Sequence, residues 1–228
     1  MSTHGRLAVG VDAARGGWLA VCLVDGAFHD AILVRRFGEV IERWGDAGAI
    51  GVDVPIGLPA TGMRAADRLA RKILAHGRSS VFPVPPRPVL EARTYERACR
   101  VSRRLCGKAV SKQTYALRTR IFEVEQCLAG PPRIVEVHPE VSFTALRWGP
   151  PADPKKTWNG LTQRRQLLAR AGIVLEDVLH RAAKAAPDDV VDAAAAAWTA
   201  LRVAKGVAGT LPCTPPRDGS GREIAIWY

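Results

Sequence analysis

The order of the apolar segments in the N-terminal quarter of the chain constrains the fold most. Residues 7–12 and 18–24 are short apolar runs, and an Asp-Gly pair, typical of a β-hairpin turn, follows the second. Residues 27–34 predict a third strand, so the three segments indicate an antiparallel meander. Residues 37–44 carry apolar side chains at helical spacing, and residues 49–54 predict a fourth strand. A helix between strands three and four implies a crossover, and therefore a mixed sheet.

Helices and loops dominate the rest of the chain. Residues 64–76 predict a helix, residues 78–88 are rich in proline and must be irregular, and residues 90–128 are helical and basic. Residues 133–137 predict a fifth strand. We therefore expect one α/β domain over residues 1–228, with a helical insert at about residues 60–130 between strands four and five. Further helices are expected over residues 140–146, 161–171, 176–186 and 188–205.

Composition and charge are those of a folded protein. Hydrophobic residues make up 47% of the chain and charged residues 24%, which allows a sizeable core. No apolar run approaches the roughly 18 residues that span a bilayer, and residues 1–6 are polar, so we expect neither membrane association nor a secretory signal. The 33 Lys and Arg residues against 22 Asp and Glu give a net charge of +11, which favours a polyanionic partner such as nucleic acid.

The cysteine spacing and the absence of known motifs give no support to several classes of enzyme. The five cysteines are scattered, and no two have the C-x-x-C spacing of zinc ribbons or thioredoxin-type proteins. Reduced thiols in a cytoplasmic protein are the simplest interpretation. The sequence also lacks a Walker A motif, a G-x-G-x-x-G fingerprint and an H-E-x-x-H pair, so it gives no support to nucleotide-driven or dinucleotide chemistry.

Carboxylates interrupt the apolar segments at several points. Asp12 ends the first predicted strand, Asp53 lies in the fourth and Glu136 in the fifth, while Asp189 and Asp192 share one face near the start of the longest helix. Burying an acid without a partner costs several kcal/mol, so these positions need a common explanation. Mg²⁺ or Mn²⁺ provides one, because both prefer carboxylate oxygens. Two such ions about 4 Å apart can promote hydrolysis of a phosphodiester.

Each acid also has a simpler interpretation. A single Asp at the end of a strand often forms a turn, and Asp188 and Asp189 can cap a helix or complement its dipole. Glu136 can pair with one of the many arginines. It is their combined order, three acids on strands and then acids on a helix, that favours a metal site.

Several stretches resemble a known family. They are Val-Gly-Val-Asp at 9–12, Gly-Gly-Trp at 16–18, Asp-Val-Pro-Ile-Gly-Leu-Pro at 53–59, Ser-Ser-Val-Phe-Pro at 79–83, Ser-Lys-Gln at 111–113, Glu-Val-His-Pro-Glu at 136–140 and Asp-Val-Val-Asp-Ala at 189–193. Together they resemble a large prokaryotic family of unknown function, described as predicted nucleases with a ribonuclease H-like (RNase H-like) fold. The resemblance covers residues 7–201. It implies a mixed five-stranded sheet with an antiparallel meander and parallel fourth and fifth strands, flanked by helices.

The resemblance also implies a set of catalytic acids. Asp12 and Asp53 would bind the metal, Glu136 would be a third acid, and Asp192, with Asp189 one turn earlier, resembles the helical pair of Holliday-junction resolvases. The chain departs from ribonuclease H in one respect. No acid in the helix after the third strand aligns clearly with the corresponding ligand, and this family's pattern suggests that Glu136 replaces it.

Other residues are candidates for binding substrate. His138 follows Glu136 and can shuttle a proton, or it can be a structural histidine at the strand end. Arg15, in the loop after Asp12, can contact a phosphate or be an exposed loop residue. Lys112 and Gln113 begin a predicted helix and can touch substrate. The insert also carries a basic helical face that can bind a phosphate backbone or simply be solvated, made of Arg93, Arg97, Arg100, Arg103 and Arg104.

These observations predict a metal-dependent nuclease or phosphodiesterase that hydrolyses nucleic acid and uses Mg²⁺ or Mn²⁺. One alternative is a catalytically inactive RNase H-like module that binds nucleic acid or another partner, because the insert can narrow the cleft. A more distant alternative is a relative of the actin-like phosphotransferases. These need two such domains, for which 228 residues are too few. Metal-dependent cleavage separates the first two possibilities.

Overall fold

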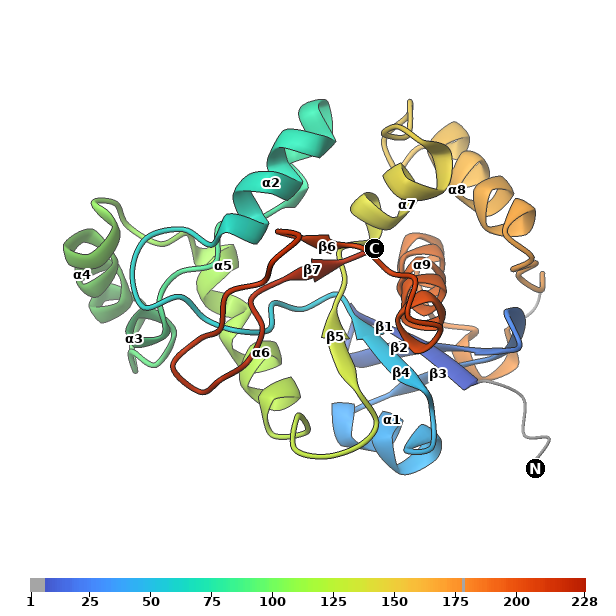
Figure 1. Cartoon of the computed structure of the whole chain (residues 1–228), viewed down its shortest axis with the longest axis horizontal. Coiled ribbons are helices and arrows are strands. Elements are labelled where there is room, and N and C mark those ends of the chain that lie inside the picture. The colour runs from blue at the N-terminus through green and yellow to red at the C-terminus, as the bar shows by residue number, and fades with distance from the viewer. Residues whose placement is uncertain (1–6, 178) are drawn as a thin grey trace.

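The computed structural model describes residues 7–177 and 179–228, and within them five strands form one mixed sheet (Figure 1). The strands are β1 (Leu7–Ala14), β2 (Gly17–Val24), β3 (Ala27–Val34), β4 (Ala49–Val52) and β5 (Ile134–Glu136). Their order is β3-β2-β1-β4-β5. β2 pairs antiparallel with β1 and β3, whereas β4 pairs parallel with β1 and β5. The mixed sheet with an antiparallel meander and parallel fourth and fifth strands is thus confirmed.

Helices cover both faces of this sheet and fill the segment between β4 and β5 (Figure 1). That segment contains α2 (Ala65–Leu74), the 3₁₀ turn η1 (Ala75–Ser80), α3 (Arg87–Leu90), α4 (Tyr95–Cys106), α5 (Lys112–Ala116) and α6 (Arg118–Glu125). The remaining helices are α1 (Phe37–Trp44), α7 (Pro139–Arg147), α8 (Trp158–Arg170), the 3₁₀ turn η2 (His180–Ala182) and α9 (Pro187–Ala204).

Two sequence predictions of regular structure are wrong. Strand four was expected to run to residue 54, but β4 ends at Val52, so Asp53 lies just beyond the strand. The helix expected over residues 176–186 is absent from the described residues, which form only the short turn η2; position 178 of that range lies outside the described residues. Ala182 is the only residue described as buried in that range, and Leu179 and Ala185 are only partly buried against the same cluster, so the segment packs too little apolar surface to hold a full helix.

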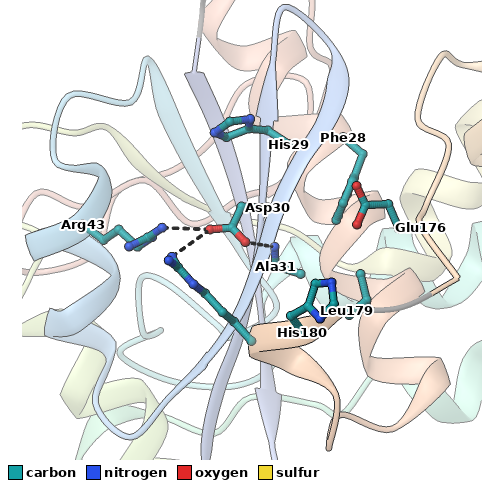
Figure 2. Close-up of a pocket in the computed structure, with 9 residues that line it drawn as sticks. Phe28, His29, Asp30, Ala31, Arg43, Glu176, Leu179 and His180 are labelled. Atoms are coloured by element: carbon teal, nitrogen blue, oxygen red, sulfur yellow. Dashed lines mark hydrogen bonds and ion pairs between the residues drawn. The ribbon is translucent and has the colours of Figure 1, made fainter.

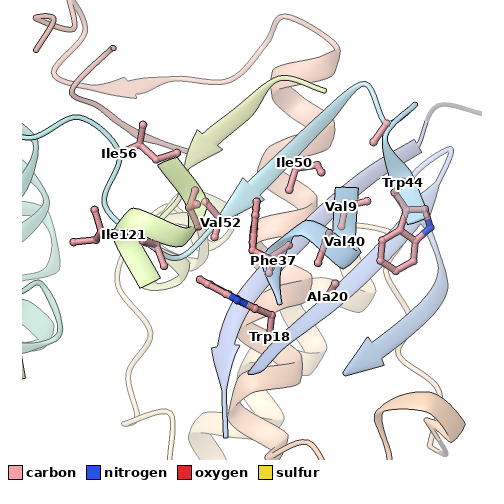
Figure 3. Close-up of a cluster of buried hydrophobic side chains, with 14 of the residues drawn as sticks. Val9, Trp18, Ala20, Phe37, Val40, Trp44, Ile50, Val52, Ile56 and Ile121 are labelled. Carbon is pink, nitrogen blue, oxygen red and sulfur yellow. The ribbon is translucent and has the colours of Figure 1, made fainter. Parts of the chain in front are cut away.

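The sheet is buried on both faces. On one face, Trp18 and Phe37 meet edge to face with ring centres 5.2 Å apart, and α1 closes over them (Figure 3). On the other face, the alternate residues Leu19 and Val21 of β2 pack against α9. The near-continuous apolar sequence of β2 follows from this two-sided burial.

Helix α9 packs unusually close to the sheet because small residues face each other. A Cβ atom on Gly10 of β1 would lie 2.0 Å from both the carbonyl oxygen of Ala193 and the amide nitrogen of Ala197. A Cβ on Gly51 of β4 would lie 2.6 Å from the carbonyl oxygen of Ala196. The later residue Ala204 of α9 lies beside Gly48, before β4 begins. Helix α9 therefore runs antiparallel to β1 and β4, and its first turns reach the carboxyl ends of both strands.

The C-terminal segment adds a second, small sheet beside β5. Strands β6 (Thr210–Leu211) and β7 (Ile226–Trp227) pair antiparallel, and Trp227 bridges to Val137 just after β5. The amide of Leu58 donates to Asp218 Oδ2 at 3.3 Å, which ties this segment to the turn after β4.

The expectations about targeting are tested only in part. Residues 1–6, on which the absence of a secretory signal was predicted, lie outside the described residues. In the part of the chain that is described, no helix has the length and apolar character needed to cross a bilayer.

Candidate functional site: a carboxylate cavity

Three acids from separate elements meet at the carboxyl ends of β1 and β4. Asp12 lies in β1, Asp53 follows β4, and Asp192 lies in the second turn of α9. The amide of Asp53 donates to the carbonyl of Val11 at 2.9 Å, which continues the β1–β4 ladder by one residue and fixes the position of Asp53. All three line a cavity of about 470 Å³, together with Asp189. We call it the carboxylate cavity.

Burial makes these carboxylates hard to ionise. It is the largest cause that raises the pKa of Asp53 and of Asp192 to about 7. It also raises the pKa of Asp12 well above its ordinary value, and the charges of Asp53 and Asp192 add to that shift. The pKa of Asp189 is raised by burial and by Asp188. An excess of buried negative charge at this point therefore calls for a cation.

A lysine that sequence reasoning missed supplies one positive charge. Lys155 lies in the loop between α7 and α8, and its ammonium group donates a hydrogen bond to Asp192 Oδ2. Burial opposes its charge, but Asp192, Asp12 and Asp53 together raise its pKa. The other oxygen, Asp192 Oδ1, is buried and has no hydrogen-bond partner among the described residues. This buried carboxylate oxygen is thus left without a donor within the described ranges.

Glu136 also lines the cavity, but its oxygens are already occupied. Arg64 donates from Nη1 to Oε2 at 2.7 Å and from Nη2 to Oε1 at 2.6 Å, and the amide of Ile56 donates to Oε2 at 2.7 Å. Arg64 Nη2 also pairs with Asp67 at 2.6 Å. Although burial opposes its charge, the two acids raise the pKa of Arg64 and keep it a cation. The assignment of Glu136 as a metal ligand stays a prediction, and we leave it out of the proposal below.

His138 and Glu140 complete the wall next to β5. Burial lowers the pKa of His138, which favours the neutral imidazole, and its Nδ1 has no hydrogen-bond partner in the described part of the chain. Glu140 accepts two hydrogen bonds from Arg164, at 2.9 and 2.7 Å. Its charge nevertheless adds to the raised pKa values of Asp53 and Asp192. The Glu-x-His-Pro-Glu stretch of the sequence was the only signal for Glu140.

The other predicted substrate contacts lie outside this cavity. Arg15 is exposed in the turn between β1 and β2, and it does not belong to the lining. Lys112 and Gln113 are exposed in the first turn of α5, also outside the lining. The ammonium group of Lys112 lies 6.0 Å from the ring centre of Tyr95. Their proposed contacts with substrate stay predictions.

The donor set of the cavity suits a hard cation. Mg²⁺ and Mn²⁺ prefer carboxylate oxygens as ligands. The cavity offers such oxygens, and the buried Asp192 Oδ1 has no hydrogen-bond donor among the described residues. Over the described ranges, no group of three or more His, Cys, Asp or Glu side chains has the geometry of a ready metal site. Instead, the ammonium group of Lys155 forms an ion pair with Asp192 and acts as a counter-ion for the acids of the cavity.

A second cavity, of about 410 Å³, lies between β3 and η2 (Figure 2). Its one strand acid, Asp30, accepts from Arg43 at 2.8 Å and from Arg181 at 3.5 Å, and also from the amide of Ala31 at 2.9 Å. The negative charge of Asp30 is therefore balanced by two arginines. Because this cavity has no comparable excess of buried carboxylates, we do not take it as the candidate site.

Comparison with known proteins agrees with part of the resemblance. The sequence pattern of the family described as "Protein of unknown function (DUF429)" matches residues 10–217, which is most of the chain. No curated protein and no solved structure matches the chain.

Proposed function

The chain belongs to the DUF429 family of proteins of unknown function, and from the carboxylate cavity we propose that it is a metal-dependent phosphodiesterase acting on nucleic acid. One observation carries the proposal. Asp12, Asp53 and Asp192 come from three separate elements and share one cavity, where burial raises their pKa values. We also propose that the fold is RNase H-like, on the basis of the strand order and the helix α9 that brings an acid to β1.

Asp12, Asp53 and Asp192 would hold one or two Mg²⁺ or Mn²⁺ ions, with Asp189, which also lines the cavity, as a further ligand. A divalent cation bound there would supply the Lewis acidity and the activated water for phosphodiester hydrolysis. Glu136 and Arg64 act differently in this proposal. Their ion pair joins the end of β5 to the start of α2, and the bond from Ile56 holds the turn that carries Asp53.

Lys155 has two roles in this proposal. In the metal-free protein its ammonium group neutralises part of the acid cluster. With a divalent cation bound among the acids, Lys155 would be available to bind a phosphate together with Lys156, which lines the same cavity. The net charge of +11 suits a polyanionic substrate.

The test is a cleavage assay with Mn²⁺ on a panel of labelled single-stranded, duplex, hybrid and junction substrates. The wild type should cleave at least one of them, and Asp12→Asn should abolish cleavage without changing the fold. Asp46→Asn is the matched control, because Asp46 is exposed after α1 and outside the cavity. Folded Asp12→Asn protein that cleaves as fast as the wild type would refute the assignment.

One observation favours a second candidate, a nucleic-acid-binding module without catalysis. Lys155 already neutralises Asp192, and the described residues hold no ready metal group. Tight binding across the same panel, with no turnover in Mn²⁺, would support this module and contradict the phosphodiesterase.

We further propose a cytoplasmic location. All five cysteines are free thiols in the structure, as is usual for proteins of a reducing compartment.

A further inference from the structure

A third cavity, of about 350 Å³, lies within the helical insert. We call it the insert cavity. Its walls are the proline-rich segment 82–85, residues Met63 and Val110, and one side of α4 at Ser102 and Cys106. The lining is mainly apolar, and the volume is in the range that accommodates a small planar ligand. Nothing in the proposed chemistry uses this cavity.

Phe82 joins the insert cavity to the carboxylate cavity. This residue lines both cavities, and it is 39% exposed and not part of the buried core. Phe82 is partly exposed where the apolar insert cavity meets the acids of the carboxylate cavity, so it is not needed to pack a hydrophobic core. Such a ring is suited to stack against another planar group.

Helix α4 borders this hollow through Ser102 and Cys106 and is basic on its outer, exposed side. Arg97, Arg100, Arg103 and Arg104 are all exposed on it, and none forms a salt bridge within the described ranges. Lys108, also exposed, follows the helix and lines the cavity. A lysine that lines an apolar hollow, next to a helix with a basic outer side, is complementary to a chain of phosphates that carries planar bases.

We propose that the insert cavity binds one unpaired nucleobase of a polynucleotide, which stacks on Phe82 while Lys108 contacts the adjacent phosphate and the arginines on the outer side of α4 attract the rest of the chain. The inference deepens the proposed function and rests on it for the choice of polymer. The shared residue Phe82 places the bound base next to the phosphodiester that enters the carboxylate cavity. Because every base has a π face, the subsite selects unpaired bases and not a particular sequence.

The test measures binding without catalysis, by fluorescence anisotropy in EDTA. The probes are a labelled ten-nucleotide oligothymidylate and an abasic oligomer with the same number of phosphates. The wild type should bind the oligothymidylate more tightly, and Phe82→Ala should weaken that binding about 5- to 140-fold while leaving the abasic oligomer unaffected. Phe82→Tyr, which keeps the ring, should restore it. Met63→Ala, on a wall outside the carboxylate cavity, should show a smaller loss of the same kind.

Two controls separate stacking from charge. Trp148→Ala removes a ring that is 98% exposed at the end of α7, far from α4 in Figure 1, and should change neither affinity. Arg100→Ala with Arg103→Ala should weaken both oligomers equally and lower the salt slope by about 1.4, whereas the exposed Arg170→Ala should not.

Equal affinity of the wild type for the two oligomers, or an equal loss on both in Phe82→Ala, would overturn the subsite. Its failure is distinct from failure of the phosphodiesterase. Base-dependent binding without cleavage in Mn²⁺ would leave the subsite standing and contradict the enzyme. Cleavage in Mn²⁺ without base-dependent binding would support the phosphodiesterase and contradict the subsite.

Discussion

Gly10→Ala is the sharpest test of how α9 is placed against the sheet. The added Cβ would lie 2.0 Å from two backbone atoms of α9, where ordinary contact begins at 3.4 Å. Since both atoms are backbone, no side chain can rotate away, and the helix would have to move by about 1.4 Å, the difference between these distances. Overpacking of this kind costs about 3 kcal/mol or more. In a chain of this size that lowers the melting temperature by about 6–12 °C.

The matched control is the same substitution at Gly38, in α1, where an added Cβ meets nothing within 4 Å. There alanine should stabilise the helix by about 1 kcal/mol and raise the melting temperature by about 2–4 °C. Differential scanning fluorimetry of both variants measures the contrast. Because α9 carries Asp192, Gly10→Ala should also weaken Mn²⁺ binding. If Gly10→Ala melts at or above the wild-type temperature, the close approach of α9 is refuted.

Three further predictions concern the charges of the cavity. Because burial raises the pKa of Asp53 and Asp192 from 3.8 to about 7, the folded metal-free protein binds more protons than the unfolded chain between these values. Its melting temperature in EDTA should therefore rise as the pH is lowered from about 8 to about 5, and Asp53→Asn should flatten this rise. Arg64→Met leaves buried carboxylates without their cation and should lower the free energy of unfolding, measured in urea, by about 3–5 kcal/mol, part of which Glu136→Gln should restore. Lys155→Met should increase Mn²⁺ affinity in calorimetry, since the ammonium group no longer competes for Asp192; an unchanged affinity would argue against that competition.

Much of the sheet is predictable from the sequence because its signals are local. The turn after residue 24 and the short connections define the meander, and the helix at 37–44 forces the crossover to a parallel strand. The helix expected over 176–186 is wrong for the opposite reason. Its residues favour a helix locally, but of those described only Ala182 is fully buried, so tertiary packing stabilises no more than a short turn there.

Part of the candidate site was likewise predictable from local sequence signals, and part of it was not. The meeting of Asp12 and Asp53 follows from parallel neighbouring strands, and the small alanines after Asp192 allow α9 to approach the sheet closely. An arginine partner for Glu136 was one of the sequence interpretations, but which arginine it is, and the role of Lys155, were not predictable. Arg64 is 72 residues from Glu136, and Lys155 is 37 residues from Asp192. Both lie in segments whose paths depend on the whole fold.

The most direct test of the central claim is anomalous scattering from Mn²⁺-soaked crystals of the wild-type protein. The account predicts a strong anomalous peak between the carboxylates of Asp12, Asp53 and Asp192, with Lys155 withdrawn from Asp192. A cavity without a peak at saturating Mn²⁺, with Lys155 still bonded to Asp192, would contradict it.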